Sequence, residues 1–290
     1  MIDLHTHSSA SDGDLSPADL VLEARKKGIS TLALTDHDTL AGLESAALAA
    51  KAAGIGFVPG IEISINWRGE DEVCHMGRGG EMHVLGLGIR SPTPGFLAAV
   101  ADLSVRRETR NREIMARVLD MGVDATWEEV VALSGGHSVG RPHFAMLLVN
   151  KKVVRTHEQA FDRFLRPGKP LYAPKTGLTF ADAADMIRES GGIPVLAHPM
   201  SLFVAWGRMG EIVGSLRDRG LMGLEAWHPT AKPKACRRLE RMAAELGLLV
   251  TEGSDFHGSA MSYRRLGWSN KDRQISDSLL DSLPNLLLKQ

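Results

Sequence analysis

Short apolar runs alternate with helical patterns over about the first 65 residues and again after residue 176. Strands are predicted at 2–7, 31–35, 57–64, 193–197, 223–226 and 248–251, and helices at 16–27, 42–53, 180–190, 210–219 and 232–245. Ser16 is a typical helix N-cap followed by proline, and Gly28 ends the same helix. Strands and helices that alternate in this way predict an α/β domain built on a parallel sheet or barrel.

This alternation stops between about residues 91 and 175. A long helical pattern at 96–121 has a basic middle that we interpret as solvated, with Arg106, Arg107, Arg110 and Arg112. Shorter helical patterns follow at 127–133, 141–149 and 157–165. The chain therefore predicts a barrel domain made of residues 1–90 and 176–290, interrupted by a mostly helical insertion at 91–175.

Residues 66–80 also interrupt the pattern, because they are charged and rich in glycine. They predict a flexible loop or a long hairpin. His75 lies in this stretch without a strand to position it, so we interpret it as a loop histidine. Residues 81–89 are apolar again and alternate around His83, which places His83 on a strand.

Histidine and aspartate recur where the predicted strands end. His5 and His7 share one face of the first strand, about 7 Å apart, because alternate residues of a strand point the same way. The pattern gives six histidines and three carboxylates as candidate metal ligands: His5, His7, Asp12, His37, Glu62, His83, His198, Asp255 and His257. The carboxyl ends of barrel strands form one mouth, so we expect these side chains to meet there.

Burying so many titratable groups together without a cation would cost several kcal/mol for each group. Nine ligands exceed the needs of one ion, so we expect two or three ions with Glu62 as the bridging carboxylate. Imidazole and carboxylate ligands without thiolate favour Mn²⁺, with Fe²⁺ or Zn²⁺ as alternatives. Such a centre indicates an enzyme in which metal-bound hydroxide attacks a phosphoryl group whose charge the ions stabilise.

The composition limits which partners the protein could bind and where in the cell it could work. A net charge of −1 argues against a broad electrostatic grip on duplex DNA, although local basic residues still permit a small nucleotide or short oligonucleotide. Cys74 and Cys236 indicate neither a disulfide framework nor a cysteine-based zinc site. No apolar stretch approaches the ~20 residues of a membrane helix, and no signal peptide precedes the first strand. We therefore expect a cytoplasmic protein without membrane contact.

The motifs around these ligands resemble those of the PHP (polymerase and histidinol phosphatase) domain family. The resemblance is carried in order by His5-Thr6-His7, Thr35-Asp36-His37, His198-Pro199 and Asp255-Phe256-His257. It implies a distorted (β/α)7 barrel with a trinuclear site, whose mouth the helical insertion caps. It also implies three ligand sets: His5, His7, Glu62 and Asp255; Asp12, His37 and His257; and Glu62, His83 and His198.

Basic residues of the insertion are the candidate substrate contacts. Arg141 stands before a proline at a predicted helix start, where the helix N-terminus and a guanidinium both attract phosphate; the alternative is a surface turn. His143, Lys169 and Lys175 could reach a phosphate as well. His228 follows a strand and is a candidate phosphate contact or general acid, the alternative being a helix-start residue.

The stretches Arg141–Ala145 and Gly168–Tyr172 resemble those of stand-alone PHP phosphoesterases with a helical insertion. Members of that subgroup remove the 3′-phosphate of 3′,5′-nucleoside bisphosphates, and some trim short RNA from the 5′ end. The resemblance implies this function, with Arg141 and His143 holding the phosphate that is not cleaved. The alternatives are a histidinol-phosphate phosphatase, which needs one phosphate site, and a non-catalytic metal-binding PHP module. The sequence carries no signal for the native ion, the preferred base, the choice between mononucleotide and RNA, or the oligomeric state.

Overall fold

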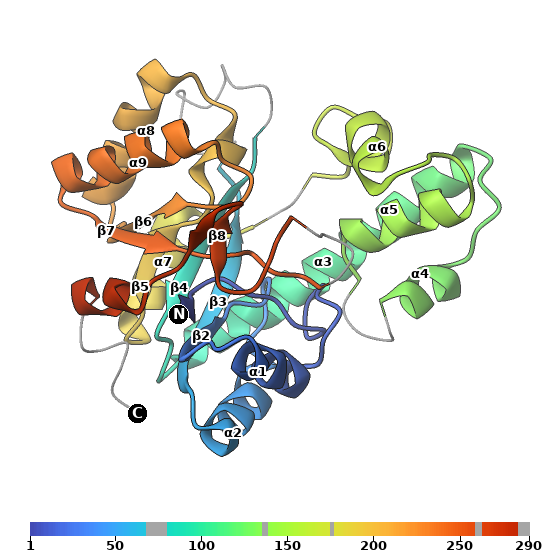
Figure 1. Cartoon of the computed structure of the whole chain (residues 1–290). Helices are drawn as coiled ribbons and strands as arrows, with labels where there is room; N and C mark the ends of the chain where they lie inside the picture. Colours follow the sequence, from blue (N-terminus) through green and yellow to red (C-terminus); the bar gives the residue numbers. More distant parts are fainter. Residues whose placement is uncertain (68–79, 135–138, 175–176, 259–262, 284–290) are drawn as a thin grey trace.

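The computed structural model describes residues 1–67, 80–134, 139–174, 177–258 and 263–283. Seven strands form one sheet in sequence order: β1 (Ile2–Asp3), β2 (Thr31–Leu34), β3 (Gly56–Ile65), β4 (Met82–Leu87), β5 (Ile193–Leu196), β6 (Gly223–Trp227) and β7 (Leu249–Glu252). Beyond β1 and β7 the chain pairs again through a parallel bridge between Thr6 and Phe256. The sheet therefore nearly closes, and the predicted α/β barrel is confirmed (Figure 1).

Strand β4 is antiparallel to both of its neighbours, β3 and β5, whereas the other paired strands of this sheet are parallel. Ser64 near the end of β3 pairs with His83 near the start of β4, and Val84 pairs with Leu196 at the end of β5. The start of β4 therefore lies at the edge where the parallel strands end. The predicted strand around His83 is confirmed, but the expectation of a parallel sheet is wrong at β4.

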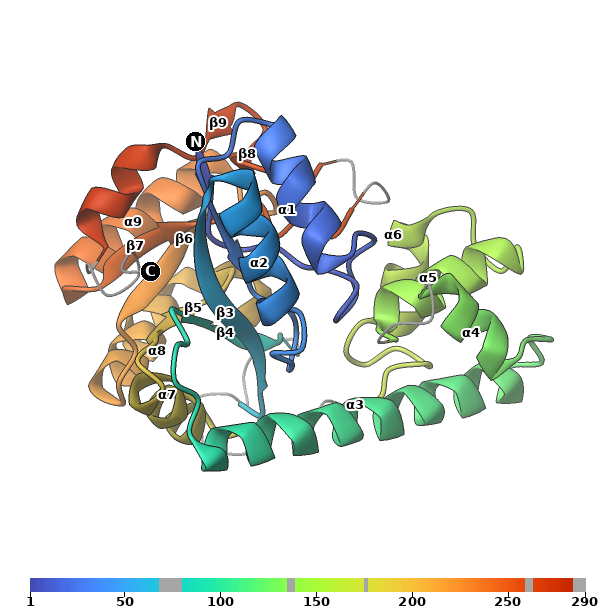
Figure 2. The same ribbon diagram turned by 90° about the horizontal axis from the view of Figure 1, so that it is seen from below.

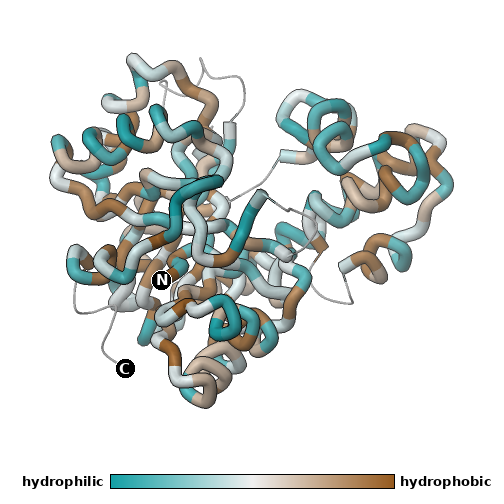
Figure 3. Tube along the Cα trace, in the orientation of Figure 1, coloured by the Kyte–Doolittle hydropathy of each residue, from teal (hydrophilic) through white to brown (hydrophobic). Residues whose placement is uncertain are grey.

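Helices cover the outside of the barrel: α1 (Pro17–Lys26), α2 (Leu43–Ala53), α7 (Phe180–Glu189), α8 (Trp206–Asp218) and α9 (Pro233–Leu246). Ser16 accepts a hydrogen bond from the Asp19 amide and so caps α1 as predicted. Helix α8 begins before the predicted residue 210, because Trp206 and Met209 pack against the barrel's apolar residues. Figure 3 shows hydrophobic stretches in the strands of the sheet, whereas hydrophilic and hydrophobic residues alternate along the helices. In the described ranges, no helix is both long enough and apolar enough to cross a membrane.

The helical insertion leaves the barrel on one long helix, α3 (Pro94–Asp120), which runs along the barrel and extends beyond it (Figure 2). Its far end packs with α4 (Trp127–Leu133), α5 (Arg141–Asn150) and α6 (His157–Ala160), and α6 continues as a π-helical turn at Phe161–Leu165. These elements enclose an apolar cluster of their own, which is separate from the clusters of the barrel.

Two arginines of α3 do not face solvent. Arg107 and Arg110 are each only 8% exposed, and they share the buried side of the helix with Leu103 and Ile114. Positions three and four residues apart lie on one side of a helix, which explains this grouping. The interpretation of the basic stretch as solvated is therefore wrong for these two, whereas Arg106 and Arg112 are exposed as expected.

The chain after β7 differs from the pattern-based expectation. A hairpin of β8 (Trp268–Asn270) and β9 (Arg273–Gln274) was not predicted. Its Arg273 binds the buried Glu252 through Nη2 at 2.6 Å and Nε at 3.0 Å. A 3₁₀-helix at Asp277–Ser282 follows the hairpin, and the chain from Pro284 onward lies outside the described residues. The predicted loop or hairpin at 66–80, with His75, also falls largely outside them.

Gly253 follows β7 where the chain presses against the first strand. A Cβ atom there would lie 2.3 Å from the His5 Cβ and 2.7 Å from Glu225 Oε1. Gly253→Ala should therefore lower the free energy of unfolding by about 1–3 kcal/mol in urea denaturation. Gly210→Ala in helix α8 is the matched control, because its Cβ would meet no atom closer than 3.9 Å. It should raise stability by about 0.5–1 kcal/mol, and equal stability of the two variants would contradict the close approach.

Candidate metal centre

The structure brings all nine predicted ligands together at the edge of the barrel where the parallel strands end. The fully buried Glu62 of β3 lies at the centre of this group. Five imidazole nitrogens surround its two oxygens: His83 Nδ1 (2.7 Å) and His198 Nε2 (2.8 Å) at Oε1, and His37 Nδ1 (3.0 Å), His7 Nε2 (3.2 Å) and His5 Nε2 (3.3 Å) at Oε2. One carboxylate is thus shared among histidines that come from four parts of the chain.

Asp255 and Asp12 supply the other two carboxylates. Asp255 Oδ1 lies 3.2 Å from His7 Nε2 and 3.3 Å from His257 Nδ1. Asp12 Oδ1 lies 3.3 Å from His257 Nε2, and Asp12 Oδ2 lies 4.0 Å from His37 Nε2. Asp255 has a φ of 51°, a conformation that residues with a Cβ atom adopt rarely and mostly at functional sites.

The ligand atoms fall into three groups, and within each group they lie within 4.8 Å of one another. The groups are His5, His7, Glu62 and Asp255; His7, Asp12, His37 and His257; and His37, Glu62 and His83. His198 adds a nitrogen beside the third group, 2.8 Å from Glu62 Oε1. Because His7, His37 and Glu62 each belong to two groups, the arrangement suits ions that share ligands.

The contacts of the His7 side chain indicate whether a metal cation fits among these ligands. Its side chain is fully buried, and neither ring nitrogen makes a hydrogen bond to a described residue. Nε2 nevertheless lies 3.2 Å from oxygens of both Glu62 and Asp255, so these groups are close without being aligned as donor and acceptor. A nitrogen and two carboxylate oxygens that face a common point are the geometry of a metal site. The residues present therefore fit a divalent metal ion.

The pKa values of the ligands agree with this interpretation. Burial raises the pKa of Glu62, but neighbouring histidines, above all His37, outweigh burial and hold the pKa well below its usual range. Burial also lowers the pKa of His37 to about 3, despite the opposing charges of Glu62 and Asp12. Burial alone would lower the pKa of His7, but the carboxylates of Asp255 and Glu62 raise it to about 9. A metal ion would replace the proton that these carboxylates attract to His7.

Glu225 of β6 contacts two of the metal ligands without belonging to the predicted ligand set. Its Oε1 lies 2.9 Å from His5 Nδ1, and its Oε2 accepts a 2.6 Å hydrogen bond from the His198 amide. Because Glu225 engages Nδ1 of His5, Nε2 of the same ring is left to face the other ligands. The signal was present in the sequence, since Glu225 lies in an apolar run between two apolar neighbours, as Glu62 does.

Arg264 and Asp36 are further residues that sequence reasoning missed. Arg264 Nη1 lies 2.7 Å from Asp255 Oδ2 and 3.0 Å from His257 Nδ1. Asp36 accepts hydrogen bonds from the Ser8 amide at 2.8 Å and the Ser11 hydroxyl at 2.5 Å, so it holds the loop that leads to Asp12. No strand or helix pattern surrounds Arg264, and the sequence therefore gave no signal for it.

His228 lies beside the ligands and faces the same site. Its Nε2 is 3.0 Å from Asp255 Oδ2, and its Nδ1 is 2.8 Å from Thr230 Oγ1. Nδ1 also accepts a 3.3 Å hydrogen bond from the Thr230 amide, so we infer that the ring proton is on Nε2 and is donated to Asp255. Burial lowers the pKa of His228, and the bond to Asp255 offsets this only in part.

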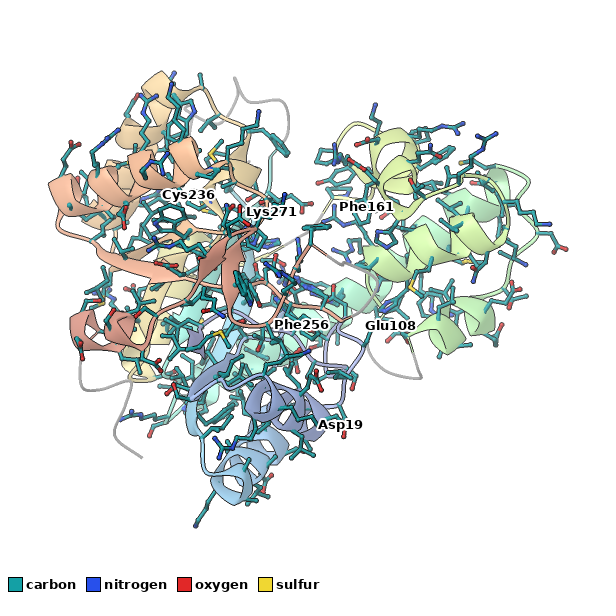
Figure 4. All side chains as sticks on the ribbon, in the orientation of Figure 1. Asp19, Glu108, Phe161, Cys236, Phe256 and Lys271 are labelled. Carbon is teal, nitrogen blue, oxygen red and sulfur yellow. The ribbon has the colours of Figure 1, made fainter. Side chains whose placement is uncertain are left out.

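A cavity of about 760 Å³ joins the candidate metal centre to the helical insertion. The barrel contributes His37 and His228 to its walls, and the insertion contributes Arg141 and Phe161. Figure 4 shows Phe161 on the side of the insertion that faces the barrel. Volumes of this order accommodate small organic ligands.

The predicted substrate-binding residues differ in their position relative to the cavity. Arg141 lines the cavity, but its guanidinium forms a two-pronged ion pair with Glu81, at 2.7 and 2.5 Å. His143 is buried, and its Nδ1 accepts a 2.9 Å hydrogen bond from the N-cap amide of α5. Lys169 is exposed and does not line the cavity, as far as the structure describes it. Lys175 lies outside the described residues.

The sequence and the fold both match known proteins. The PHP domain profile matches residues 3–167. The 5′-3′ exoribonuclease of Haemophilus influenzae is 35% identical over 88% of this chain and 89% of its own length. The 3′,5′-nucleoside bisphosphate phosphatase of Chromobacterium violaceum is 31% identical over 92% of this chain and 90% of its own length. The crystal structure of a presumed metal-dependent phosphoesterase from Bifidobacterium adolescentis, 27% identical, has a TM-score of 0.84 and covers 99% of this chain and 96% of that one. On these matches, the chain belongs to the PHP domain family.

Proposed function

We propose that this protein is a metal-dependent phosphoesterase that removes the 3′-phosphate of 3′,5′-nucleoside bisphosphates, with short 5′-phosphorylated RNA as a second substrate. The observation that carries the proposal is a single cavity with a buried metal-ligand cluster on one side and arginines on the other. A bisphosphate needs an anion site for the phosphate that is cleaved and another for the phosphate that is kept. The activities of the Haemophilus influenzae and Chromobacterium violaceum relatives support the same substrate class.

We propose Mn²⁺ as the native ion, in two or three copies, with Fe²⁺ or Zn²⁺ as the alternatives. His5, His7, Glu62 and Asp255 would hold one ion; Asp12, His37 and His257 a second; and Glu62, His83 and His198 a third. Bound divalent ions would supply Lewis acidity and lower the pKa of water at the scissile phosphate.

Residues around the ligands would prepare the site for this chemistry. Glu225 holds the tautomer of His5, so that Nε2 of His5 faces inward. His228 donates to Asp255 and uses its other nitrogen on Thr230, so we assign it a positioning role rather than proton transfer to the leaving group. Arg264 places a positive charge against Asp255 and orients the same carboxylate.

The barrel and the helical insertion would have different roles in the reaction. We propose that residues 1–90 and 176–290 form the barrel that holds the ions, and that the insertion at 91–175 caps its mouth. The separate apolar cluster of the insertion and the cavity shared by both parts support this division. We place the reaction in the cytoplasm, where nucleotides and short RNA are turned over.

The substrate assignment predicts a clear order of activities. Mn²⁺-loaded protein should release phosphate from adenosine 3′,5′-bisphosphate with a kcat/KM about 100-fold above that for histidinol phosphate, because only the nucleotide has a second phosphate to bind. A short 5′-phosphorylated RNA, assayed beside them, tests the exonuclease activity. Turnover of histidinol phosphate alone would overturn the assignment.

Metal removal should lower stability as well as activity. Ions that bind the folded barrel at 100 times their dissociation constant stabilise it by about 2.7 kcal/mol. Treatment with a chelator should therefore lower the Tm by roughly 5–10 °C in differential scanning fluorimetry, and added Mn²⁺ should restore it. Asp255→Asn lacks a ligand charge, so its Tm should respond much less to the chelator. An unchanged Tm of the wild type would count against a resident ion.

A substitution of Glu225 tests whether its contact with His5 contributes to metal binding. Glu225→Gln keeps the shape of the side chain but removes the charge that holds His5, so Mn²⁺ affinity should fall about 10- to 100-fold in calorimetric titration. Glu245→Gln makes the same charge change at an exposed position of α9 and should leave the affinity unchanged. Equal affinities in the two variants would remove Glu225 from the site.

A further inference from the structure

Four arginines of the helical insertion line the cavity: Arg107 and Arg110 from α3, Arg141 from α5, and Arg166 after the π-helical turn. Three of them have carboxylate partners. Arg166 pairs with Asp162 near the exposed edge. Arg107 Nη2 lies 3.2 Å from Asp38 Oδ2, and Arg141 forms its two-pronged pair with Glu81. Glu108, labelled in Figure 4, marks the stretch of α3 between the barrel and the far helices.

Arg110 differs from the other three. Among the described residues, no carboxylate lies within ion-pairing distance of its guanidinium. Its hydrogen bond is to the neutral Asn111 Oδ1, at 3.0 Å, and its Nε has no partner. The residue is only 8% exposed, so most of its surface is removed from bulk solvent. A buried guanidinium without a counter-ion is unfavourable, and an anionic ligand in the cavity would supply the missing negative charge.

The electrostatic surroundings of Arg110 are positive. Burial, followed by the charges of Arg107 and Arg141, lowers the pKa of Arg110 to about 9, and the charges of Glu81 and Asp38 offset this only in part. The group remains protonated at pH 7. Among the described residues, the four guanidinium groups of this cavity wall have three paired carboxylates, Asp38, Glu81 and Asp162, so one positive charge has no carboxylate partner.

The wall lies next to the candidate metal centre. The charge of Arg107 acts on both, because it lowers the pKa of Asp12 and the pKa of Arg110. Arg107 and Arg110 line the same 760 Å³ cavity as Asp12 and His37, a volume in the range that holds a nucleotide.

We propose that Arg110, with Arg107 beside it, binds the substrate phosphate that is not cleaved. This inference rests on the proposed function and deepens it, because it names the residue that distinguishes a bisphosphate from a monophosphate. It also moves this role away from Arg141 and His143, to which the sequence pattern gave it. The guanidinium of Arg141 is engaged by Glu81, and Nδ1 of His143 is engaged at the start of α5.

Arg110→Met tests the proposal in the full-length, Mn²⁺-loaded protein. The kcat/KM for adenosine 3′,5′-bisphosphate should fall about 10- to 100-fold, mainly through KM, because one charge-assisted phosphate contact is lost. Turnover of adenosine 3′-monophosphate, which lacks the second phosphate, should not change. Arg106→Met removes a charge from the exposed side of the same helix and should leave both substrates unaffected.

Stability separates a binding role from a structural one. Removing an unpaired buried charge should leave the Tm of Arg110→Met equal to or above that of the wild type. A lower Tm, or an equal loss of activity on both substrates, would show that Arg110 supports the fold and would overturn the proposal. Arg110→Lys keeps the charge and should retain part of the preference for the bisphosphate.

Binding of adenosine 5′-monophosphate separates this inference from the proposed function. The Mn²⁺-loaded wild type should bind this nucleotide more tightly than adenosine in calorimetry, and Arg110→Met should lose the difference. Wild-type protein that binds the nucleotide in this way but hydrolyses no bisphosphate would refute the proposed function and leave the anion site standing. Retention of the full difference in Arg110→Met would refute the anion site, whatever the activity.

Discussion

The site depends on a single buried carboxylate. Glu62 has no exposed surface and lies within 3.3 Å of five imidazole nitrogens. Such a cluster can exist only if each histidine enters from a different direction and if the surrounding charges balance. The barrel meets the first condition because its strands end at one edge, and the reversal of β4 brings His83 to the same edge from the start of a strand. Glu225 and Asp255 meet the second condition from opposite sides of His5.

Much of this site could be predicted from residue type and strand periodicity. His5 and His7 are two positions apart on a strand, and Asp255 and His257 repeat that spacing at the other end of the barrel. Glu225 carries the same signal as Glu62, a carboxylate inside an apolar run, so residue type alone could have indicated it. The direction of β4 could not be predicted, since the alternation of a strand is the same in both directions.

The arginines of α3 show where residue type misleads. Phe96, Val100, Leu103 and Ile114 form a buried stripe at three- and four-residue spacing, and Arg107 and Arg110 occupy positions within that stripe. Their position in the repeat, rather than their charge, determines where they point. The hairpin of β8 and β9 escaped prediction for another reason: its ion pair joins Arg273 to Glu252 across some twenty residues, and no local pattern records such a contact.

The order of the ligands along the chain has a consequence for folding. About 250 residues separate His5 from Asp255 and His257, yet these residues belong to neighbouring ligand groups. The bridge from Thr6 to Phe256 brings the two segments together where the barrel closes. The ligand groups that contain Asp255 or His257 therefore cannot assemble before these distant segments have met. Their formation depends on the closure of the barrel, and not only on the affinity of the histidines for an ion.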